Sequence, residues 1–436
     1  MAALLVWSAA AVSAGPQTLL PYQTPSQHLG VATCATSVCH GAVTPSGTQS
    51  VRLDEFVTWS HRDKHSQAYT ALSTETARAI AAKLGIADAR TDSTCLDCHS
   101  DNVPPERRGS AFTLTDGVSC EACHGGAGPW IASHSARNGT YRGDVAHGMY
   151  PTADLPQRLN LCLSCHDGNA DKFVTHRIMG AGHPRLSFEL DTFLALEPPH
   201  YDPDADYTRR KPVYPRVQVW ASGQLALARR QMELLDGPLL RQSSLVPELA
   251  LFDCHACHEN PLRRLDWSRG LLTRQTRPGQ LTFPDDHLGM AVAIAQRVAP
   301  SEADAMLAAV QSLEEAAGQS RERVSATATS LSRILDRVAS ASMAHRWTAS
   351  EVGLLLEGIV QLGSSGEFRT YSSAEQAVMA IDVLSMDLGL LDRYRAEIDA
   401  LYRTVKDEDA YSAAQLRAQL TELDARLRAA APLPLQ

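Results

Sequence analysis

Ten cysteines and sixteen histidines carry the most evident chemistry in this 436-residue chain. Every cysteine belongs to one of five pairs, and a histidine directly follows the second cysteine of each pair. Four pairs have two intervening residues, whereas the fifth pair, Cys34 and Cys39 before His40, has four. The regular motifs are Cys95, Cys98 and His99; Cys120, Cys123 and His124; Cys162, Cys165 and His166; and Cys254, Cys257 and His258.

The Cys-x-x-Cys-His pattern is the attachment sequence of c-type haem. The two sulfurs bond covalently to the porphyrin, and the histidine becomes the proximal ligand of the iron. Zinc ribbons, five disulfides or thioredoxin-like motifs also use paired cysteines, but none of them requires a histidine after each pair. The looser first pair is a rarer variant of the same motif. The sequence therefore predicts five haems c, anchored by all ten cysteines.

Eleven histidines remain, and ten of them lie between residues 28 and 287, the part of the chain that also carries the motifs. This distribution indicates that several are distal ligands, which would make the iron six-coordinate and low-spin. Residues 59–72 have the pattern of one helix, on which His61 and His65 would share a face. An exposed polar helix and a zinc-binding pair are the alternatives for this segment.

A second group of candidates lies in residues 175–186, which we expect to form a loop whose glycines allow close approach to a flat macrocycle. His183 is the preferred ligand in this segment, and His176 is the second choice. The role of His255, between two cysteines of the last motif, is left open. His200 lies between a proline and a tyrosine, and we expect it to be a surface or packing residue.

Residues 59–72, the run Gly-Val-Ser-Cys-Glu-Ala-Cys-His-Gly-Gly at 117–126, and His134 shortly after it resemble the cytochrome c-554 family. This family consists of tetrahaem electron carriers related to the haem core of hydroxylamine oxidoreductase. The resemblance covers about residues 28–190. The longer first motif, the additional fifth motif and the long C-terminal tail depart from the family pattern, and they leave the redox partner and any substrate unassigned.

For two haems the resemblance implies both axial ligands. His134 would lie opposite His40 at the first haem. His65 would lie opposite His166 at the fourth haem.

For the other two family haems the resemblance implies a distal ligand at one and no distal protein ligand at the other. The third haem, on His124, takes its distal ligand from beyond the fourth motif, a position that His183 or His176 matches. The second haem, on His99, has no distal protein ligand in the family and would therefore hold an open iron. His28 could close this iron, although the resemblance does not assign it.

The chain is expected to be mainly α-helical and to have two folded parts. Residues 1–14 resemble the end of a secretory signal peptide, residues 15–290 would form a pentahaem domain rich in irregular loops, and residues 291–436 a haem-free helical bundle. Trp220 to Leu235 has helical spacing. Four Ser/Thr residues followed three positions later by Asp, Glu or Gln predict helix starts in the bundle, at Ser301, Thr348, Ser372 and Ser412. Gly363 and Gly389 are predicted helix ends.

Charge and hydrophobicity exclude several classes of function. The net charge of −9 disfavours a nucleic-acid-binding protein, which would need basic residues to neutralise phosphates. No segment after the first fourteen residues approaches the roughly 20 apolar residues of a membrane span. Since haem attachment is expected outside the cytoplasm, we predict a periplasmic or secreted protein.

The preferred function is electron transfer through closely spaced haems between redox partners, which would be cytochromes or a quinol dehydrogenase. The alternative is a multihaem oxidoreductase that acts on a small nitrogen or sulfur compound at one open haem iron, with the haem of His99 as the preferred site. The helical tail would cover haem edges, or form an oligomer or a docking surface for other cytochromes.

Overall fold

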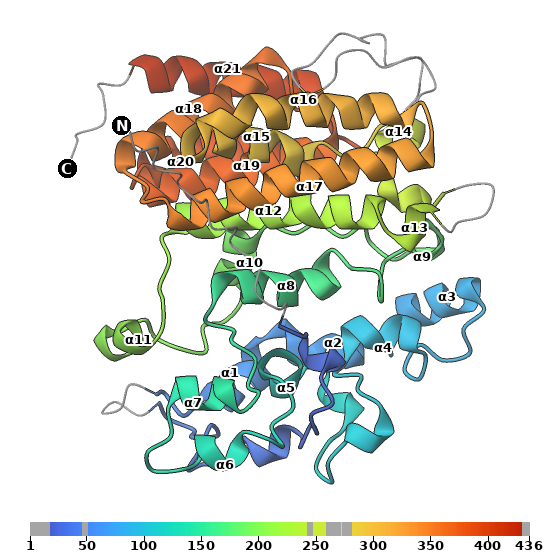
Figure 1. The fold of residues 1–436 in the computed structure, drawn as a ribbon, viewed down its shortest axis with the longest axis vertical. Helices are drawn as coiled ribbons and strands as arrows, with labels where there is room; N and C mark the ends of the chain where they lie inside the picture. The colour runs from blue at the N-terminus through green and yellow to red at the C-terminus, as the bar shows by residue number, and fades with distance from the viewer. Residues whose placement is uncertain (1–17, 46–50, 242–246, 259–271, 273–280, 430–436) are drawn as a thin grey trace, which may run out of the picture.

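The computed structural model confirms a mainly α-helical chain (Figure 1). It describes residues 18–45, 51–241, 247–258, 272 and 281–429. Within these residues there is no strand, and the single isolated β-bridge joins His28 to Arg108. No helix in the described ranges is long and apolar enough to cross a membrane. The expected signal peptide at 1–14 lies outside the described residues.

The N-terminal part consists of short helices joined by irregular segments, in the lower half of Figure 1. Its α-helices are α1 Glu55–Arg62, α2 Ala68–Ala71, α3 Glu75–Leu84, α4 Ser93–His99, α5 Cys120–His124, α6 Ile131–His134, α7 Tyr141–Ala146, α8 Leu155–His166, α9 His176–Ala181, α10 Leu190–Leu196 and α11 Ala205–Arg210. Its 3-10 helices are η1 Pro21–Gln23, η2 Val31–Thr33, η3 Lys64–Gln67, η4 Pro105–Arg107 and η5 Leu114–Asp116.

The C-terminal part is a bundle of long helices, in the upper half of Figure 1. Its elements are α12 Arg216–Leu235, α13 Pro238–Arg241, η6 Leu249–Leu251, α14 His255–His258, α15 Asp286–Val298, α16 Pro300–Ala317, α17 Arg321–Ala344, α18 Ala349–Ser365, α19 Tyr371–Asp387, α20 Leu391–Thr404 and α21 Ala413–Ala429. A single large hydrophobic cluster runs from Val217 on α12 to Leu423 on α21. The bundle therefore includes α12, N-terminal to the expected boundary at residue 290, and α15, which crosses this boundary. The fifth cysteine motif lies within the sequence range of the bundle.

Helix α12 is central to the bundle because it contacts α15, α17 and α19. Trp220 and Met232 of α12 have no exposed surface, and most of its residues are buried. The helix was expected from Trp220 to Leu235, and the structure extends it N-terminally to Arg216. Gly223 lies in the interior of this helix, where a Cβ would be 3.1 Å from the side chain of Leu190, so the missing side chain allows α10 to approach closely.

Capping side chains start several bundle helices as the sequence indicates. Thr348 and Glu351 form a capping box at α18, and Ser412 accepts the amide hydrogen of Gln415 at the start of α21. At α19 the capping residue is Thr370, two positions before the predicted Ser372. At α16 no side chain caps the helix, which begins at Pro300, a residue suited to a first turn.

One predicted helix end is correct and the other is wrong. Gly389 has φ 66° and follows α19, as expected of a left-handed terminus. Gly363 instead lies inside α18, where its missing side chain leaves room for Leu420 and Phe368. The helix ends at Gly366, whose φ of 92° is the left-handed conformation that glycine adopts without strain.

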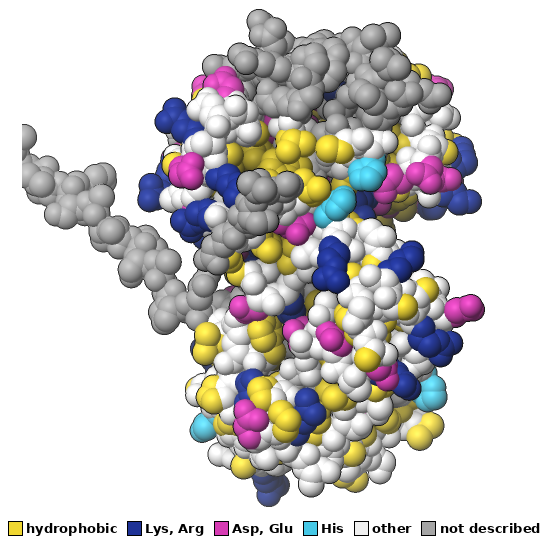
Figure 2. All heavy atoms as spheres, turned by 90° about the vertical axis from the view of Figure 1, so that its right-hand side faces the viewer, with side chains coloured by type: hydrophobic (Ala, Val, Ile, Leu, Met, Phe, Trp, Pro, Cys, Tyr) yellow, Lys and Arg dark blue, Asp and Glu magenta, His cyan; other side chains and the backbone are white. Residues whose placement is uncertain are grey.

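Both apolar and polar contacts join the two parts. A small cluster connects Leu163 on α8 with Leu190 on α10 and Val219 on α12. On the bundle side, Glu375 accepts hydrogen bonds from Arg185 at 3.1 Å and Ser187 at 2.5 Å. The space-filling view narrows between the parts and shows acidic and basic side chains interspersed over this face (Figure 2).

Glu314 is a buried acidic residue on α16. Burial, followed by the neighbouring charge of Asp285, raises the pKa of its carboxyl group from 4.5 to about 8. The folded protein thus keeps a proton that the unfolded chain releases at lower pH. This shift reduces the free energy of unfolding as the pH rises from about 4.5 to about 8.

The substitution Glu314→Gln should remove this pH-dependent loss, which amounts to about 1 kcal/mol per pH unit for one shifted carboxyl group. Thermal unfolding of the haem-loaded protein at several pH values between about 5 and 8 would measure it. The variant should gain stability relative to the parent as the pH rises. Asp304→Asn, on the exposed face of the same helix, is the matched control. Equal pH dependence of parent and Glu314→Gln protein would contradict the prediction.

Candidate haem-binding sites

The four regular motifs each end a helix at their histidine. They lie at the ends of α4, α5, α8 and α14, whose last residues are His99, His124, His166 and His258. On a helix the two cysteines, three positions apart, face the same side, which suits attachment to one porphyrin edge. The longer first motif is a turn, in which the amide of His40 donates to the carbonyl of Cys34 at 3.1 Å. No disulfide joins any of the ten cysteines, all of which lie in the described part of the chain.

Four of the five proximal histidines face the ring of a second histidine from another segment. Two imidazoles on opposite sides of one iron have ring centroids roughly 6 Å apart, because each iron–nitrogen bond is about 2 Å long. The observed centroid separations are 5.8 Å for His40 and His134, 6.0 Å for His166 and His65, 6.4 Å for His99 and His183, and 6.1 Å for His258 and His176. This donor set fits haem iron.

Hydrogen bonds at Nδ1 orient many of these rings. A metal-binding histidine typically donates its other ring N–H to a carboxylate or carbonyl oxygen, which leaves one nitrogen for the metal. The observed Nδ1 partners are Glu55 for His40 at 2.9 Å, Asp144 for His134 at 3.1 Å, Asp63 for His65 at 3.0 Å, the Ala68 carbonyl for His99 at 3.0 Å and the Pro184 carbonyl for His183 at 2.8 Å. In each of these five rings the Nε2 atom is thus left to bind a metal.

The surroundings of the rings shift their basicity in opposite directions. The hydrogen bond to Glu55 raises the pKa of His40, and the hydrogen bond to Asp63 raises the pKa of His65. Burial lowers the pKa of His99 and of His166. At the fourth motif, the carboxylate of Asp63 thus makes the ring of His65 more basic, whereas burial favours the neutral form of His166. The neutral imidazole is the form that binds metal.

The structure does not bring His183 to His124, where the resemblance would place it. The structure places His183 opposite His99, so that the iron expected to be open has a histidine facing it. Residues 176–181 form the helix α9 and not the expected loop. Gly182, with φ 118°, ends this helix in a left-handed turn, and His183 follows the turn.

His176, at the start of α9, lies opposite His258 of the fifth motif. It was a candidate for the third haem, whereas in the structure its ring lies 6.1 Å from that of His258, in a motif outside the family pattern. The signal that could have found this pairing is the count of histidines, since a fifth motif in a region rich in histidine needs a fifth partner. The pairing itself depends on how the chain returns at residues 247–258, which the sequence does not show.

The predicted single helix at 59–72 is also wrong. Helix α1 ends at Arg62, Asp63 is extended, and the chain continues as η3 and α2. The Asp63 carboxylate accepts the amide hydrogen of His65 at 2.9 Å and caps the new turn. His65 therefore faces His166, whereas His61 is exposed to solvent.

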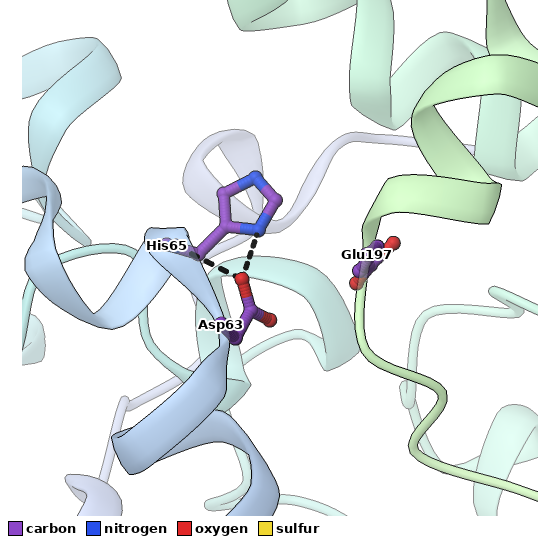
Figure 3. Close-up of side chains that lie close together, drawn as sticks. All are labelled: Asp63, His65 and Glu197. Atoms are coloured by element: carbon purple, nitrogen blue, oxygen red, sulfur yellow. Dashed lines mark hydrogen bonds and ion pairs between the residues drawn. The ribbon is translucent and has the colours of Figure 1, made fainter.

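Asp63, His65 and Glu197 lie close together, as Figure 3 shows, with donor atoms within 4.8 Å of one another. The Nδ1 atom of His65 points at Asp63, so this cluster orients the ring. Burial raises the pKa of Glu197. Because the zinc pair considered for this helix needs both His61 and His65, and the broken helix separates them, the structure gives that alternative no support.

His28 does not lie where the sequence suggested. Its side chain has no exposed surface, and its Nδ1 atom is 2.8 Å from Asp101, which also accepts a hydrogen bond from Ser119. A Cβ on Gly126 would lie 2.6 Å from the His28 ring, so the space beside it is filled by protein. The ring beside His99 in the structure is that of His183 and not that of His28.

His124 differs from the other four proximal histidines. In the described ranges no histidine ring lies opposite it at the separation seen in the other pairs. Desolvation by the surrounding protein, followed by the charges of Lys211 and His200, lowers the pKa of His124 to about 4, although its side chain keeps accessible surface. His200, expected to be a surface or packing residue, is partly exposed, and its ring nitrogens lie 3.5 Å from Asp63 and 3.8 Å from Glu197.

The remaining histidines are placed away from these pairs. His147 is exposed and bonds to the carbonyl of Gly143, His287 bonds to Gln224, and His345 contacts Glu351. The side chain of His255 lies outside what the structure describes.

Cysteines of different motifs lie side by side. The thiol of Cys34 hydrogen-bonds with that of Cys120, which lowers the pKa of Cys34 and raises that of Cys120. In the same way Cys98 contacts Cys165, whose sulfur also lies 3.1 Å from the ammonium group of Lys172. These contacts bring the first motif to the third and the second to the fourth.

Glu121, inside the third motif, fixes the N-terminal segment. Its buried carboxylate accepts hydrogen bonds from the backbone amides of Leu29 at 2.7 Å, Gly30 at 2.6 Å and Ala127 at 2.7 Å. Charge-assisted hydrogen bonds of this kind are short and strong. Glu121, which occupies a variable position of the third motif, therefore links this motif to the segment that precedes the first motif.

Comparison with known families supports the cysteine assignment. Residues 33–125 match the family described as cytochrome c554 and c-prime, a span that includes the first three motifs. Neither the curated proteins nor the solved structures give a significant match to the chain. The family match supports a c-type cytochrome with covalently bound haem c, acting in electron transfer with redox partner proteins. It also fits a protein located outside the cytoplasm.

The substitution Glu121→Gln should lower the midpoint of denaturant unfolding by the equivalent of about 2 kcal/mol, because an amide accepts the three backbone N–H groups poorly and brings a donor of its own. The matched control is Glu106→Gln, at an exposed position of η4. An unchanged midpoint for the haem-loaded Glu121→Gln protein would show that these hydrogen bonds contribute little.

Proposed function

We propose that the chain is an exported pentahaem c-type cytochrome that passes electrons between redox partner proteins in the periplasm. The observation that carries the proposal is the set of four histidine pairs, each joining a proximal histidine to one from a distant segment. Two imidazoles keep an iron six-coordinate, which suits a carrier because no substrate enters the coordination sphere. Bound haem c supplies one-electron redox chemistry.

The contacts between motifs support a continuous array of sites. Cys34 lies against Cys120, and Cys98 lies against Cys165. Cys123 and Cys162 are close enough for their charges to interact, which joins the third motif to the fourth. From these proximities we infer the order first, third, fourth and second for the first four sites. In such an array the protein positions each site, chooses its ligands and adjusts its potential through burial and hydrogen bonds.

The second candidate function is an oxidoreductase that acts on a small nitrogen or sulfur compound. The observation that favours it is His124, which lacks a facing histidine ring among the described residues. This moves the candidate open iron from His99 to His124. Lys211 and His200, whose charges contribute to the low pKa of His124, would supply a cation and a proton-transfer group beside that site.

The purified protein should carry five haems by mass. The double variant Cys254→Ser/Cys257→Ser should lose one haem, because its peptide keeps no sulfur for attachment. Material that is colourless, or that has the mass of the bare polypeptide, would contradict the proposal. A parent with four haems and an unmodified Cys254/Cys257 peptide would contradict the fifth site alone.

Electron paramagnetic resonance should separate the carrier from the enzyme. A carrier should show low-spin iron only and should not bind cyanide or nitric oxide, whereas an open site at His124 should add one high-spin signal that responds to both. If His200 fills the sixth position, His200→Ala should convert one low-spin haem to high-spin, and His61→Ala, at an exposed position of α1, should not. A high-spin signal in the parent that His200→Ala leaves unchanged would favour the enzyme.

A further inference from the structure

Helix α9 carries histidines toward two different motifs. His176, its first residue, lies 6.1 Å from the ring of His258, with an angle of 35° between the ring planes. His183, just beyond its end, lies 6.4 Å from the ring of His99, with an angle of 84°. A single short element therefore faces the second motif and the fifth motif at once.

The two histidines are held at a short and fixed separation. They are seven positions apart, and the helix from His176 to Ala181 spans five of these steps, a rise of roughly 8 Å. Thr175 caps the helix by accepting the amide hydrogen of Ile178, and Gly182 ends it with φ 118°. The backbone from His176 to His183 is therefore defined at both ends.

Hydrogen bonds tie α9 to both parts of the molecule. Arg177 donates to the carbonyl of Leu84, the last residue of α3, at 2.7 Å. Glu248 accepts the amide hydrogen of His176 at 2.7 Å and that of Ala250 at 3.0 Å. Ala250 belongs to η6, which leads into the fifth motif. The helix thus links the N-terminal sites to the segment that carries the fifth motif.

We propose that α9 couples the fifth haem site to the second. His183 would be the distal ligand at the motif that ends with His99, and His176 the distal ligand at the motif that ends with His258. This inference rests on the proposed pentahaem function and adds the place of the fifth haem site within the array. The fifth site extends the array beyond His99, at the end opposite to His40, and becomes its terminal member.

The placement agrees with the order of the other motifs. In the array derived from the cysteine contacts, the second motif is an end member, because Cys98 contacts Cys165. The other end is the first motif, where Cys34 contacts Cys120 and His40 faces His134. Because α9 lies beside His99, the fifth site would extend the array at the end formed by the second motif.

The test uses the haem-loaded protein and the substitutions His176→Met and His183→Met. Methionine in place of a distal histidine raises the reduction potential of that haem. Visible spectra and potentiometric titration should show one changed haem in each variant, and a different one in the two. His61→Met is the matched control, since His61 is exposed on α1 and should leave all potentials unchanged.

Adjacency is tested by combining the substitutions. Neighbouring sites interact, so the potential shifts of His176→Met and His183→Met should fail to add in the double variant. The shifts of His176→Met and His134→Met should add, because those sites lie at opposite ends of the array. Equal additivity in both double variants would overturn the proposed adjacency.

The outcomes distinguish this inference from the function on which it rests. If the peptide containing Cys254 and Cys257 carries haem, but His176→Met has the spectrum and potentials of the parent, the role of α9 is wrong and the five-haem protein stands. If that peptide carries no haem, the pentahaem function itself fails. A changed fifth haem in His176→Met, with non-additive shifts only in the His183 combination, supports the inference.

Discussion

The hydrogen bond from the Nδ1 atom of a histidine to a fixed oxygen is the interaction on which the candidate sites depend. Glu55, Asp63 and Asp144 each hold one imidazole by this contact. Without it a ring could rotate about its side-chain bonds, and either nitrogen could face the metal. The carboxylates are themselves held by secondary structure, since Asp63 also caps η3. The geometry of the pairs therefore follows from backbone positions.

The helical bundle is more than an appendage to the cysteine motifs. Its core begins with α12, and the fifth motif lies between α12 and α15 in the sequence. Arg185 and Ser187, which follow His183 in the sequence, bind Glu375 of α19. The bundle thus contacts the segment that carries His176 and His183. A role as a docking surface or oligomer interface stays a prediction.

Where the expectations differ from the structure, a local side-chain interaction or a long-range contact explains the difference. Asp63 breaks the predicted helix at 59–72 because its carboxylate competes for the amide of His65. The loop expected at 175–186 is helical because Thr175 caps it and Gly182 terminates it. His28, offered as a ligand, is enclosed by Asp101 and Gly126, a neighbourhood that joins segments far apart in the chain.

The sequence by itself determined the cysteine motifs, their proximal histidines and the helical character of the chain, because attachment chemistry and helix capping depend on residues only a few positions apart. It also indicated His134 and His65 as partners, through a resemblance, and the structure brings these rings to His40 and His166. Only the tertiary structure decided that His183 faces His99 and His176 faces His258. Those pairings join segments that meet through contacts such as Arg177 with Leu84 and His176 with Glu248, and spacing along the chain carries no record of such contacts.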